Sequence, residues 1–233
     1  MTITLVIAPM DEELQALKQK LKNYKEKVYG DIKGFEFRAK KGKVIAIKGC
    51  VGKANTAYDI GYMAAKYDIK RIINYGVAGS LVDELVPLKV VVADKVCYYD
   101  CDLTSGGDYK LGQMAGEELY FETDKKVLKV LEKLNTTLDI SVGTIISGDS
   151  FATKANMTDE LLKNFDNPLC VDMESGATAQ ISHRLNIPFT IIRAISDKVF
   201  AEDNGGMFAE FCEMSSRRAA SIVLHILNNE YVD

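Results

Sequence analysis

The sequence has no hydrophobic run long enough to form a membrane helix. Its longest apolar stretches, residues 3–9, 86–93 and 188–195, have the length of buried strands. They fall well short of the ~20 residues that a membrane-spanning helix needs. The chain starts almost directly with the first of these stretches, and no basic segment or cleavage site of an export signal precedes it. We therefore expect a cytoplasmic protein with no membrane partner.

An excess of positive charge is also lacking. The 29 Lys and Arg residues are outnumbered by 33 Asp and Glu residues, which gives a net charge of −4. Proteins that bind nucleic acids usually carry a basic patch or stripe that neutralises phosphates. We expect no nucleic-acid partner.

Cysteine and histidine occur too rarely to predict a disulfide framework or a metal site. The five cysteines form no C-x-x-C pair, and their number is odd. The two histidines, His183 and His225, lie in helical patterns, so a zinc site would require distant segments to converge. Cys97 and Cys101 lie close to Asp100, but small thiols are common in protein cores. We expect no metal and no cofactor.

What the sequence does contain is a regular alternation of strand and helix patterns. Such alternation predicts α/β layering, with helices packed on the faces of a sheet. The predicted strands cover 2–8, 35–39, 44–48, 72–75, 89–99, 141–146 and 189–195, with a hairpin turn at 40–43. The predicted helices cover 11–21, 53–67, 123–134, 158–165 and 208–227, and another begins at Glu174. The polar stretch 100–118 is long for a connector and indicates a functional segment. Without a linker or repeat, we expect one domain over residues 1–233.

Two runs in the last third of the chain point to an enzyme. VDMESGATA places Met173 and Glu174 at the start of a helix, and IIRAISD ends a buried strand in Ser196 and Asp197. Open α/β sheets bind ligands at the carboxyl ends of their strands. Two carboxylates delivered there by neighbouring elements can divide the work, one binding a polar substrate and the other transferring a proton.

Other predicted strand ends carry motifs suited to a ligand, each with a purely structural alternative. The glycines of the GVAG run at 76–79 either let a ligand approach the backbone or only form a turn. Phe151 offers a flat surface for a nucleobase or a core side chain. The acids from Asp11 to Glu13 serve a site or only favour a helix N-terminus. Co-location favours function, because four strand ends of a parallel-type sheet point the same way.

Taken in order, these motifs resemble those of the bacterial 5′-methylthioadenosine/S-adenosylhomocysteine nucleosidases, within the nucleoside phosphorylase superfamily. The similar segments span the chain: PMDEE, VGKANTA, NYGVAGS, VVADKVCYYDCDLT, TIISGDSFA, DMESGATA and IPFTIIRAISD. Individual glycine turns are nonspecific, but the ordered series is specific. The resemblance implies a single α/β domain with a twisted, partly barrel-like mixed sheet surrounded by helices. It also implies a homodimer that binds a small-molecule nucleoside.

The resemblance further implies roles in the hydrolysis of an N-ribosidic bond. Asp197 matches the family's general acid, which protonates the purine, and Glu13 matches the acid that activates the attacking water. Glu174 matches the carboxylate that binds the ribose hydroxyls and favours positive charge on the sugar. The other implied substrate-binding residues are Phe151 as the stacking ring, Ala152 through its backbone, Met173 against the sugar, Phe208 over the alkylthio tail, Arg193 near the water, Ser196 near the acid, and Met10, Val51, Ala78 and Gly79. A hinge at Gly205-Gly206 would let Phe208 close over the tail.

The chain departs from the family pattern at three places. Val77 stands where a Ser or Thr is usual, and Ala152 is smaller than the branched residue often found there. The segment 111–118 lacks a proline that commonly borders the tail pocket. These departures bear on the preference among methylthioadenosine, adenosylhomocysteine and 5′-deoxyadenosine more than on the class of reaction.

Three other functions compete with hydrolysis. A purine nucleoside phosphorylase needs a cationic or amide-rich cradle for phosphate. This chain presents acids at 11–13 instead and lacks the Gly-Asp-Pro-x-Arg run of such phosphorylases. A catalytically silent nucleoside-binding relative would have lost Glu13 or Asp197, and both are present. A dinucleotide-binding oxidoreductase would carry a G-x-G-x-x-G signature, which the sequence lacks.

Overall fold

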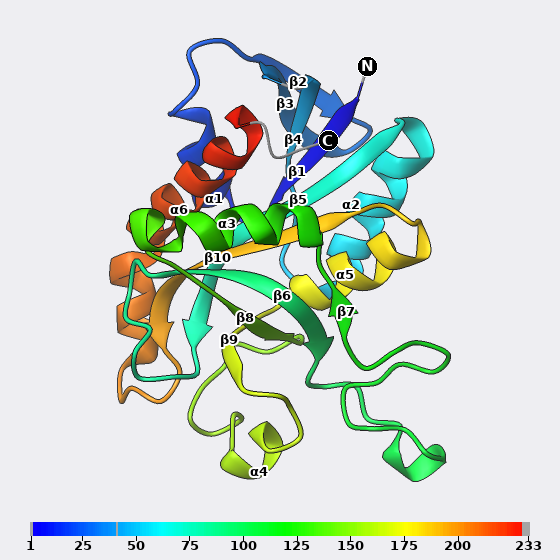
Figure 1. Cartoon of the computed structure of the whole chain (residues 1–233), viewed down its shortest axis with the longest axis vertical. Helices are drawn as coiled ribbons and strands as arrows, with labels where there is room; N and C mark the ends of the chain where they lie inside the picture. Colours follow the sequence, from blue (N-terminus) through cyan, green and yellow to red (C-terminus); the bar gives the residue numbers. More distant parts are fainter. Residues whose placement is uncertain (1, 41, 230–233) are drawn as a thin grey trace.

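The computed structural model describes residues 2–40 and 42–229, and a mixed sheet of ten strands runs through them (Figure 1). One group of parallel strands comprises β1 (Ile3–Ala8), β4 (Gly42–Lys48), β5 (Ile69–Ser80) and β10 (Phe189–Lys198). A second parallel group comprises β6 (Val90–Tyr98), β8 (Ile140–Ser147) and β9 (Pro168–Asp172). β2 (Lys25–Tyr29) and β3 (Ile32–Ala39) extend the sheet beyond β4, and β7 (Phe121–Glu122) pairs with β6.

Antiparallel pairs join the two parallel groups and close part of the sheet into a ring. β10 pairs with β5 on one side and with β6 on the other, so β10, β6, β8, β9 and β5 form a closed circuit. The last residues of β5, Gly79 and Ser80, complete the circuit by pairing with β9. The predicted barrel-like mixed sheet is confirmed. The expectation that all the site's strand ends belong to one parallel-type sheet is wrong, because β8 belongs to the second group.

Helices cover both faces of the sheet because adjacent residues of a strand face opposite ways. Val6 of β1 belongs to the same hydrophobic cluster as residues of α1 (Asp11–Lys18), α3 (Lys125–Leu138) and α6 (Asn204–Asn228). Its neighbour Leu5 packs instead with residues of α2 (Lys53–Lys66) and α5 (Ser175–Arg184). In Figure 1, α6 and α1 lie to the left of the sheet, and α2 and α5 lie to its right.

The sequence analysis does not predict β2, β7 or β9. β2 reads KEKVY, β7 has two residues, and β9 begins with a proline and has five. Apolar periodicity identifies buried or half-buried strands of ordinary length, so charged or short strands escape it. The predicted hairpin is present as the antiparallel β3–β4 pair, in which Ala39 pairs with Gly42. Lys41, which falls within the predicted turn, lies outside the described residues.

Most predicted helices differ from the observed ones at their ends. α1 stops at Lys18 rather than at 21, α2 stops one residue early, and α3 covers 125–138 rather than 123–134. The helix predicted at 158–165 is reduced to α4 (Asp159–Leu162), and a short 3-10 helix (Thr104–Gly106) lies in the polar stretch. Helix ends are the least certain part of a pattern, because local turns and caps decide them.

α6 begins four residues earlier than predicted. Its first turn contains Gly205 and Gly206, so the expected hinge is not found at these glycines. The Asp203 carboxylate accepts a hydrogen bond from the Gly206 N–H (2.9 Å) and caps the helix. A Cβ at Gly206 would lie 2.2 Å from that carboxylate. The glycine therefore permits the cap rather than a hinge.

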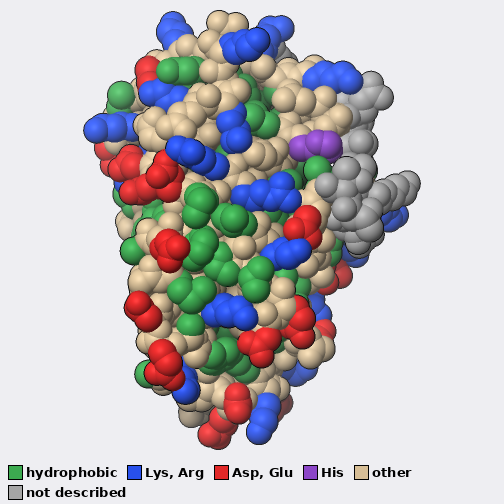
Figure 2. All heavy atoms as spheres, turned by 90° about the vertical axis from the view of Figure 1, so that its left-hand side faces the viewer, with side chains coloured by type: hydrophobic (Ala, Val, Ile, Leu, Met, Phe, Trp, Pro, Cys, Tyr) green, Lys and Arg blue, Asp and Glu red, His purple; other side chains and the backbone are tan. Residues whose placement is uncertain are grey.

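Mixed charge covers the side of the molecule that carries α6 (Figure 2). Acidic and basic side chains are interspersed there around hydrophobic side chains near the middle of the face. Within the described residues, none of the helices combines the length and the apolar character that a membrane span requires.

Candidate active site

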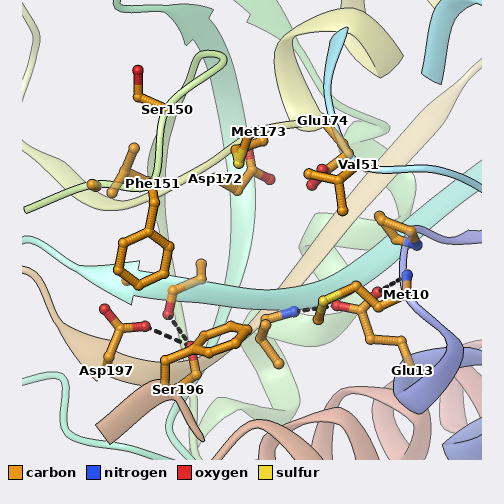
Figure 3. A pocket seen from close by; sticks show the side chains of 17 residues that line it. Met10, Glu13, Val51, Ser150, Phe151, Asp172, Met173, Glu174, Ser196 and Asp197 are labelled. Atoms are coloured by element: carbon orange, nitrogen blue, oxygen red, sulfur yellow. Dashed lines mark hydrogen bonds between the residues drawn. The ribbon is translucent and has the colours of Figure 1, made fainter. Parts of the chain in front are cut away.

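A cavity of about 210 Å³ forms where the carboxyl ends of both strand groups meet (Figure 3). Its walls come from the segments after β1, β4, β8 and β9, from the ends of β5 and β10, and from α6. Arg193 is the one predicted site residue that does not line the cavity, and it is fully buried. The predicted residues that do line it are Met10, Glu13, Val51, Ala78, Gly79, Phe151, Ala152, Met173, Glu174, Ser196, Asp197 and Phe208.

Glu13 is held in the cavity wall by the backbone on two sides. Its Oε2 accepts a hydrogen bond from the N–H of Met10, which precedes α1, as in the second half of a capping box (2.9 Å). Its Oε1 accepts one from the N–H of Val77 on β5 (2.9 Å). The two acids before it, Asp11 and Glu12, are exposed, whereas Glu13 is 2% exposed. The helix-dipole interpretation therefore suits the first two acids, and Glu13 belongs to the cavity.

The GVAG run lies inside β5 and not in a turn after it, which corrects the predicted strand end at 75. Its first glycine is needed for a side chain rather than for a ligand, because a Cβ at Gly76 would lie 2.3 Å from Glu13 Oε1. Val77, the unusual residue at its position, contacts the acid through its main chain. A valine side chain there leaves this hydrogen bond intact.

Arg193 of β10 brings positive charge to this end of the cavity. Its Nε donates to Asp172 Oδ2 (2.5 Å), and its Nη2 donates to Asn74 Oδ1 (2.8 Å). Nη2 also lies 3.7 Å from Glu174 Oε2. The Asn74 amide donates in turn to Thr178 Oγ1 of α5 (2.9 Å). The guanidinium thus links two buried carboxylates to three strands and a helix.

Glu174 immediately precedes α5, as predicted, and faces the same region. Its Oε1 accepts a hydrogen bond from the N–H of Gly52, which follows β4 (3.1 Å). Gly52 has φ of 100°, a conformation that favours glycine.

Burial and the neighbouring Asp172 raise the pKa of Glu174, and Arg193 opposes the rise. Burial likewise raises the pKa of Glu13 to about 7, against Arg193 and the two backbone hydrogen bonds. We call Glu13, Asp172, Glu174 and Arg193 the Glu13 end of the cavity.

Asp197 lies within β10, which corrects the prediction that the strand stops at 195. The pairing with β5 shifts register here: Ile195 is opposite Ala78, and Asp197 is opposite Gly79. Adjacent strand residues normally face opposite ways, but a bulge interrupts this alternation and re-aims side chains. Ser196 and Asp197 therefore both line the cavity, and Ser196 Oγ donates to Asp197 Oδ1 (2.7 Å).

The environment of Asp197 raises its pKa above the ordinary value. Asp197 is 2% exposed, and burial raises the pKa of its carboxyl group. Hydrogen bonds from Ser196 and Asn204 oppose this rise. A carboxyl group with a raised pKa keeps its proton to a higher pH, which suits a general acid.

Two aromatic rings form an apolar wall beside this acid. The centroids of Phe151 and Phe208 lie 5.7 Å apart, with the rings nearly perpendicular. Phe151 is 46% exposed, which favours the cavity surface over the core among its two interpretations. A flat ring with a free face can stack on a planar heterocycle. We call Ser196, Asp197, Phe151 and Ala152 the Asp197 end of the cavity.

Four polar groups of the site escape the sequence analysis. Asp172 and Glu174 flank a methionine, so two acids spaced by one residue at a strand end were a visible signal. Asn74 interrupts the apolar run IIN within a strand, which is a weaker signal of a buried polar contact. The Gly52 N–H and the Asn204 side chain give no local signal, because their partners lie far away in the sequence.

The chemistry of the walls argues against two kinds of ligand. Among the described residues, no lysine or arginine lines the cavity, so a free phosphate would find little cationic support. No group of three or more His, Cys, Asp or Glu side chains in the described chain is arranged to hold a metal ion.

Comparisons with known proteins identify the family of the chain. A model of the Phosphorylase superfamily matches residues 4–228. The 5′-methylthioadenosine/S-adenosylhomocysteine nucleosidase of Halalkalibacterium halodurans is 33% identical over 229 residues, which cover 97% of this chain and 98% of that protein.

Solved structures are similar over the same length. The 5′-methylthioadenosine/S-adenosylhomocysteine nucleosidase of S. pneumoniae with the transition-state inhibitor MT-ImmA is 34% identical, with a TM-score of 0.90 over 97% of this chain and 98% of that one. The S-adenosylhomocysteine nucleosidase of Streptococcus pyogenes in complex with 5-methylthiotubericidin is 32% identical, with a TM-score of 0.91 over 99% and 97%.

Proposed function

The chain belongs to the phosphorylase superfamily and, within it, to the 5′-methylthioadenosine/S-adenosylhomocysteine nucleosidases, and from this premise we propose how its cavity works. It is an N-glycosidase, and its substrates are 5′-methylthioadenosine and S-adenosylhomocysteine, which it hydrolyses to adenine and the thioribose. The observation that carries the mechanism is the presence of two buried carboxyl groups, Glu13 and Asp197, on different walls of one cavity, each with a raised pKa.

Asp197 acts as the general acid. Breaking the bond between the sugar's anomeric carbon and the purine leaves electrons on a base that departs poorly as an anion. Asp197 donates its proton to the five-membered ring of the purine, so the base leaves neutral. Phe151 stacks on the purine, and the backbone at Ala152 reads the edge of the base. The buried, raised-pKa carboxyl beside an exposed ring supports this assignment.

Glu13 acts as the general base. A water molecule adds its oxygen to the anomeric carbon, and Glu13 takes the proton that the water loses. Glu174 binds the ribose hydroxyls, with Met173 against the sugar, and its negative charge favours the positive charge that develops on the ribose. Backbone hydrogen bonds to both oxygens of Glu13 support this role, because they hold its carboxylate in one orientation.

Apolar groups bind the 5′ substituent of the sugar. Phe208 and Met10 line the cavity and offer no charged partner to the tail. We include 5′-deoxyadenosine among the substrates for this reason. Each methylene of the tail should add roughly 0.8 kcal/mol when it is buried.

Adenine release in phosphate-free buffer tests the proposal. The three nucleosides are incubated with the enzyme, with and without phosphate, and both products are identified by mass spectrometry. We expect free thioribose (or 5-deoxyribose) and adenine at rates that do not depend on phosphate. Strict dependence on phosphate, with a ribose 1-phosphate product, would show a phosphorylase instead. Binding of the nucleoside without turnover would show a silent relative.

We also propose that the enzyme is a cytoplasmic homodimer. A second cavity between α2 and α5 is lined by Ala54, Ala57 and Ala177 and by Met114 of the 100–118 segment. Lys53, Asp149 and Gln180 also line it. A largely apolar surface of this kind suits a second copy of the chain, which would bring the 100–118 segment to the interface. Sedimentation equilibrium should give twice the mass of the 25.8 kDa chain. A monomer throughout the micromolar range would contradict the dimer.

A further inference from the structure

Asn204, the first residue of α6, makes two hydrogen bonds behind the Asp197 end of the cavity. Its Nδ2 lies 2.8 Å from the carbonyl oxygen of Ala152 and 3.4 Å from Asp197 Oδ2. Both partners accept hydrogen bonds when Asp197 is ionised, so the NH₂ group must face them rather than Oδ1. Asn204 is 9% exposed and does not line the cavity. It therefore acts on the wall of the site and not on a ligand.

The first turns of α6 contact the 150–152 segment at a second residue, Phe151, besides the hydrogen bond to Ala152. Phe208 lies one helical turn after Asn204, on the same face of α6. Its ring contacts the Phe151 ring edge to face. Because Asp203 caps this turn, the positions of Asn204 and Phe208 are set by a helix rather than by a loose loop.

We propose that Asn204 is a positioning residue for the hydrolysis, because its carboxamide holds the acid Asp197 in register with the backbone of Ala152. The inference rests on the function proposed above, in which Asp197 protonates the purine while Ala152 reads the edge of the base. A catalytic proton transfer requires heavy atoms about 2.6–3.2 Å apart. A misplacement of about 1 Å can cost on the order of 10²-fold in rate. One amide bonded to both sides of the purine site supplies this alignment.

Asn204 also influences the ionisation of Asp197. Two donors favour the ionised carboxylate, Ser196 on the same strand and Asn204 on α6. Cys212, further along α6, carries a thiol close enough for its own pKa to respond to the charge of Asp197. Lys198 directs its amino group to the backbone of Asp83 instead. Loss of the Asn204 donor therefore raises the pKa of Asp197, and a carboxylate at position 204 raises it further by repulsion.

Substitutions at position 204 test the inference through the pH profile of kcat/KM in phosphate-free buffer. Activity falls as the pH rises through the pKa of the acid, because the acid must be protonated. We expect Asn204→Ala to lower kcat by about 10-fold or more, with a smaller change in KM, and to move the descending limb to higher pH. Asn204→Asp should move that limb further, and Asn204→Gln should restore part of the rate.

Asn156→Ala is the matched control. The Asn156 amide donates to the carbonyl oxygen of Phe151 (3.0 Å), so it supports the same segment without contacting Asp197. We expect the descending limb of this variant to stay in place. Thermal denaturation establishes that each variant is folded, and the near-isosteric Asn204→Asp carries the pH test if Asn204→Ala is not.

Two results would overturn the inference. One is a wild-type kcat and descending limb in Asn204→Ala. The other is a loss of rate in the Asn204 variants that matches Asn156→Ala and leaves the limb unmoved, since this would show mere structural support. Failure of the proposed function looks different: the wild-type enzyme would release no adenine, or Asp197→Asn would turn over at nearly the wild-type rate.

Discussion

The Glu13 end and the Asp197 end of the cavity both bury carboxyl groups, but they surround them differently. At the Glu13 end, the charge of Arg193 is shared by three acids, Asp172, Glu174 and Glu13. At the Asp197 end, the acid is bonded by the neutral groups of Ser196 and Asn204 and lies beside an aromatic wall.

The placement of one guanidinium can therefore separate a base from an acid. Burial raises the pKa at both ends. At the Glu13 end, Arg193 opposes the rise, so Glu13 can ionise near neutral pH, as a base must. No cation is among the groups that act on Asp197, and burial raises its pKa against the hydrogen bonds from Ser196 and Asn204. Under the proposed mechanism, these different surroundings accompany two different roles, Glu13 as the base and Asp197 as the acid.

The most direct way to break this comparison is to neutralise each acid in turn. Asp197→Asn removes the transferable proton, and Glu13→Gln removes the base, while both keep the shape of the side chain. Each should lower turnover by roughly 10²–10⁴-fold, the usual contribution of a general acid or base. Steady-state kinetics and calorimetric binding of adenine provide the measurement, and adenine affinity should change far less than turnover. Either variant with near wild-type turnover would remove that residue from the mechanism.

Alanine substitution at two glycines of β5 tests the same comparison, because the added methyl group would displace the neighbouring acid. A Cβ at Gly76 would lie 2.3 Å from Glu13 Oε1, which the Val77 N–H holds in place through a hydrogen bond. A Cβ at Gly79 would lie 2.8 Å from a methyl group of Val199 and 3.1 Å from Asp197 Oδ2. We expect Gly76→Ala to lower kcat by about 10²-fold and Gly79→Ala to cost less. Equal kcat values for Gly76→Ala and wild type would contradict the close packing of Glu13.

Ligand charge sharpens the comparison at the Glu13 end. A cationic sugar mimic that carries an adenine-like base should bind more tightly than its neutral carbocyclic counterpart, because the site complements a positive ribose. Glu174→Gln should reduce this preference by roughly 10-fold or more, as expected for a hydrogen bond to a charged group. Calorimetry with both ligands measures the difference. Adenine alone, which lacks the sugar, serves as the control. An unchanged preference in Glu174→Gln would show that Glu174 does not stabilise charge.

The smallest expected effect is on stability. Glu13 releases its proton at about 7 in the folded state and near the ordinary value of 4.5 in the unfolded state. The folded state therefore binds more protons between these values, and its stability falls as the pH rises through this window. The melting temperature of Glu13→Gln relative to wild type should increase from pH 5 to pH 7 by a few degrees, since 1 kcal/mol corresponds to about 2–4 °C here. A difference that does not depend on pH would show that Glu13 is not desolvated.

The sequence predicts the surface of the cavity better than the network behind it. Asp197 could be placed because an apolar strand followed by a polar group is a local pattern, and Glu174 because it begins a helical pattern. The bulge at Ser196 could not be predicted, because it depends on how β10 pairs with β5. Asn204 gives no signal, because its partners Ala152 and Asp197 come from other elements. Arg193 was assigned by resemblance, but its bond to Asp172 requires the fold.

Closure of the strand ring also decides where the sheet could join another molecule. β10 would otherwise be a terminal strand, but it is paired on both sides. In the described sheet β2 is one strand that is paired on one side only, and in it Lys25 and Glu26 are exposed beside the half-buried Lys27. Charged side chains on an edge strand oppose pairing with strands of other chains. The closed ring therefore leaves the charged strand β2 at the edge of the sheet, and its charges oppose edge-to-edge aggregation of the folded protein.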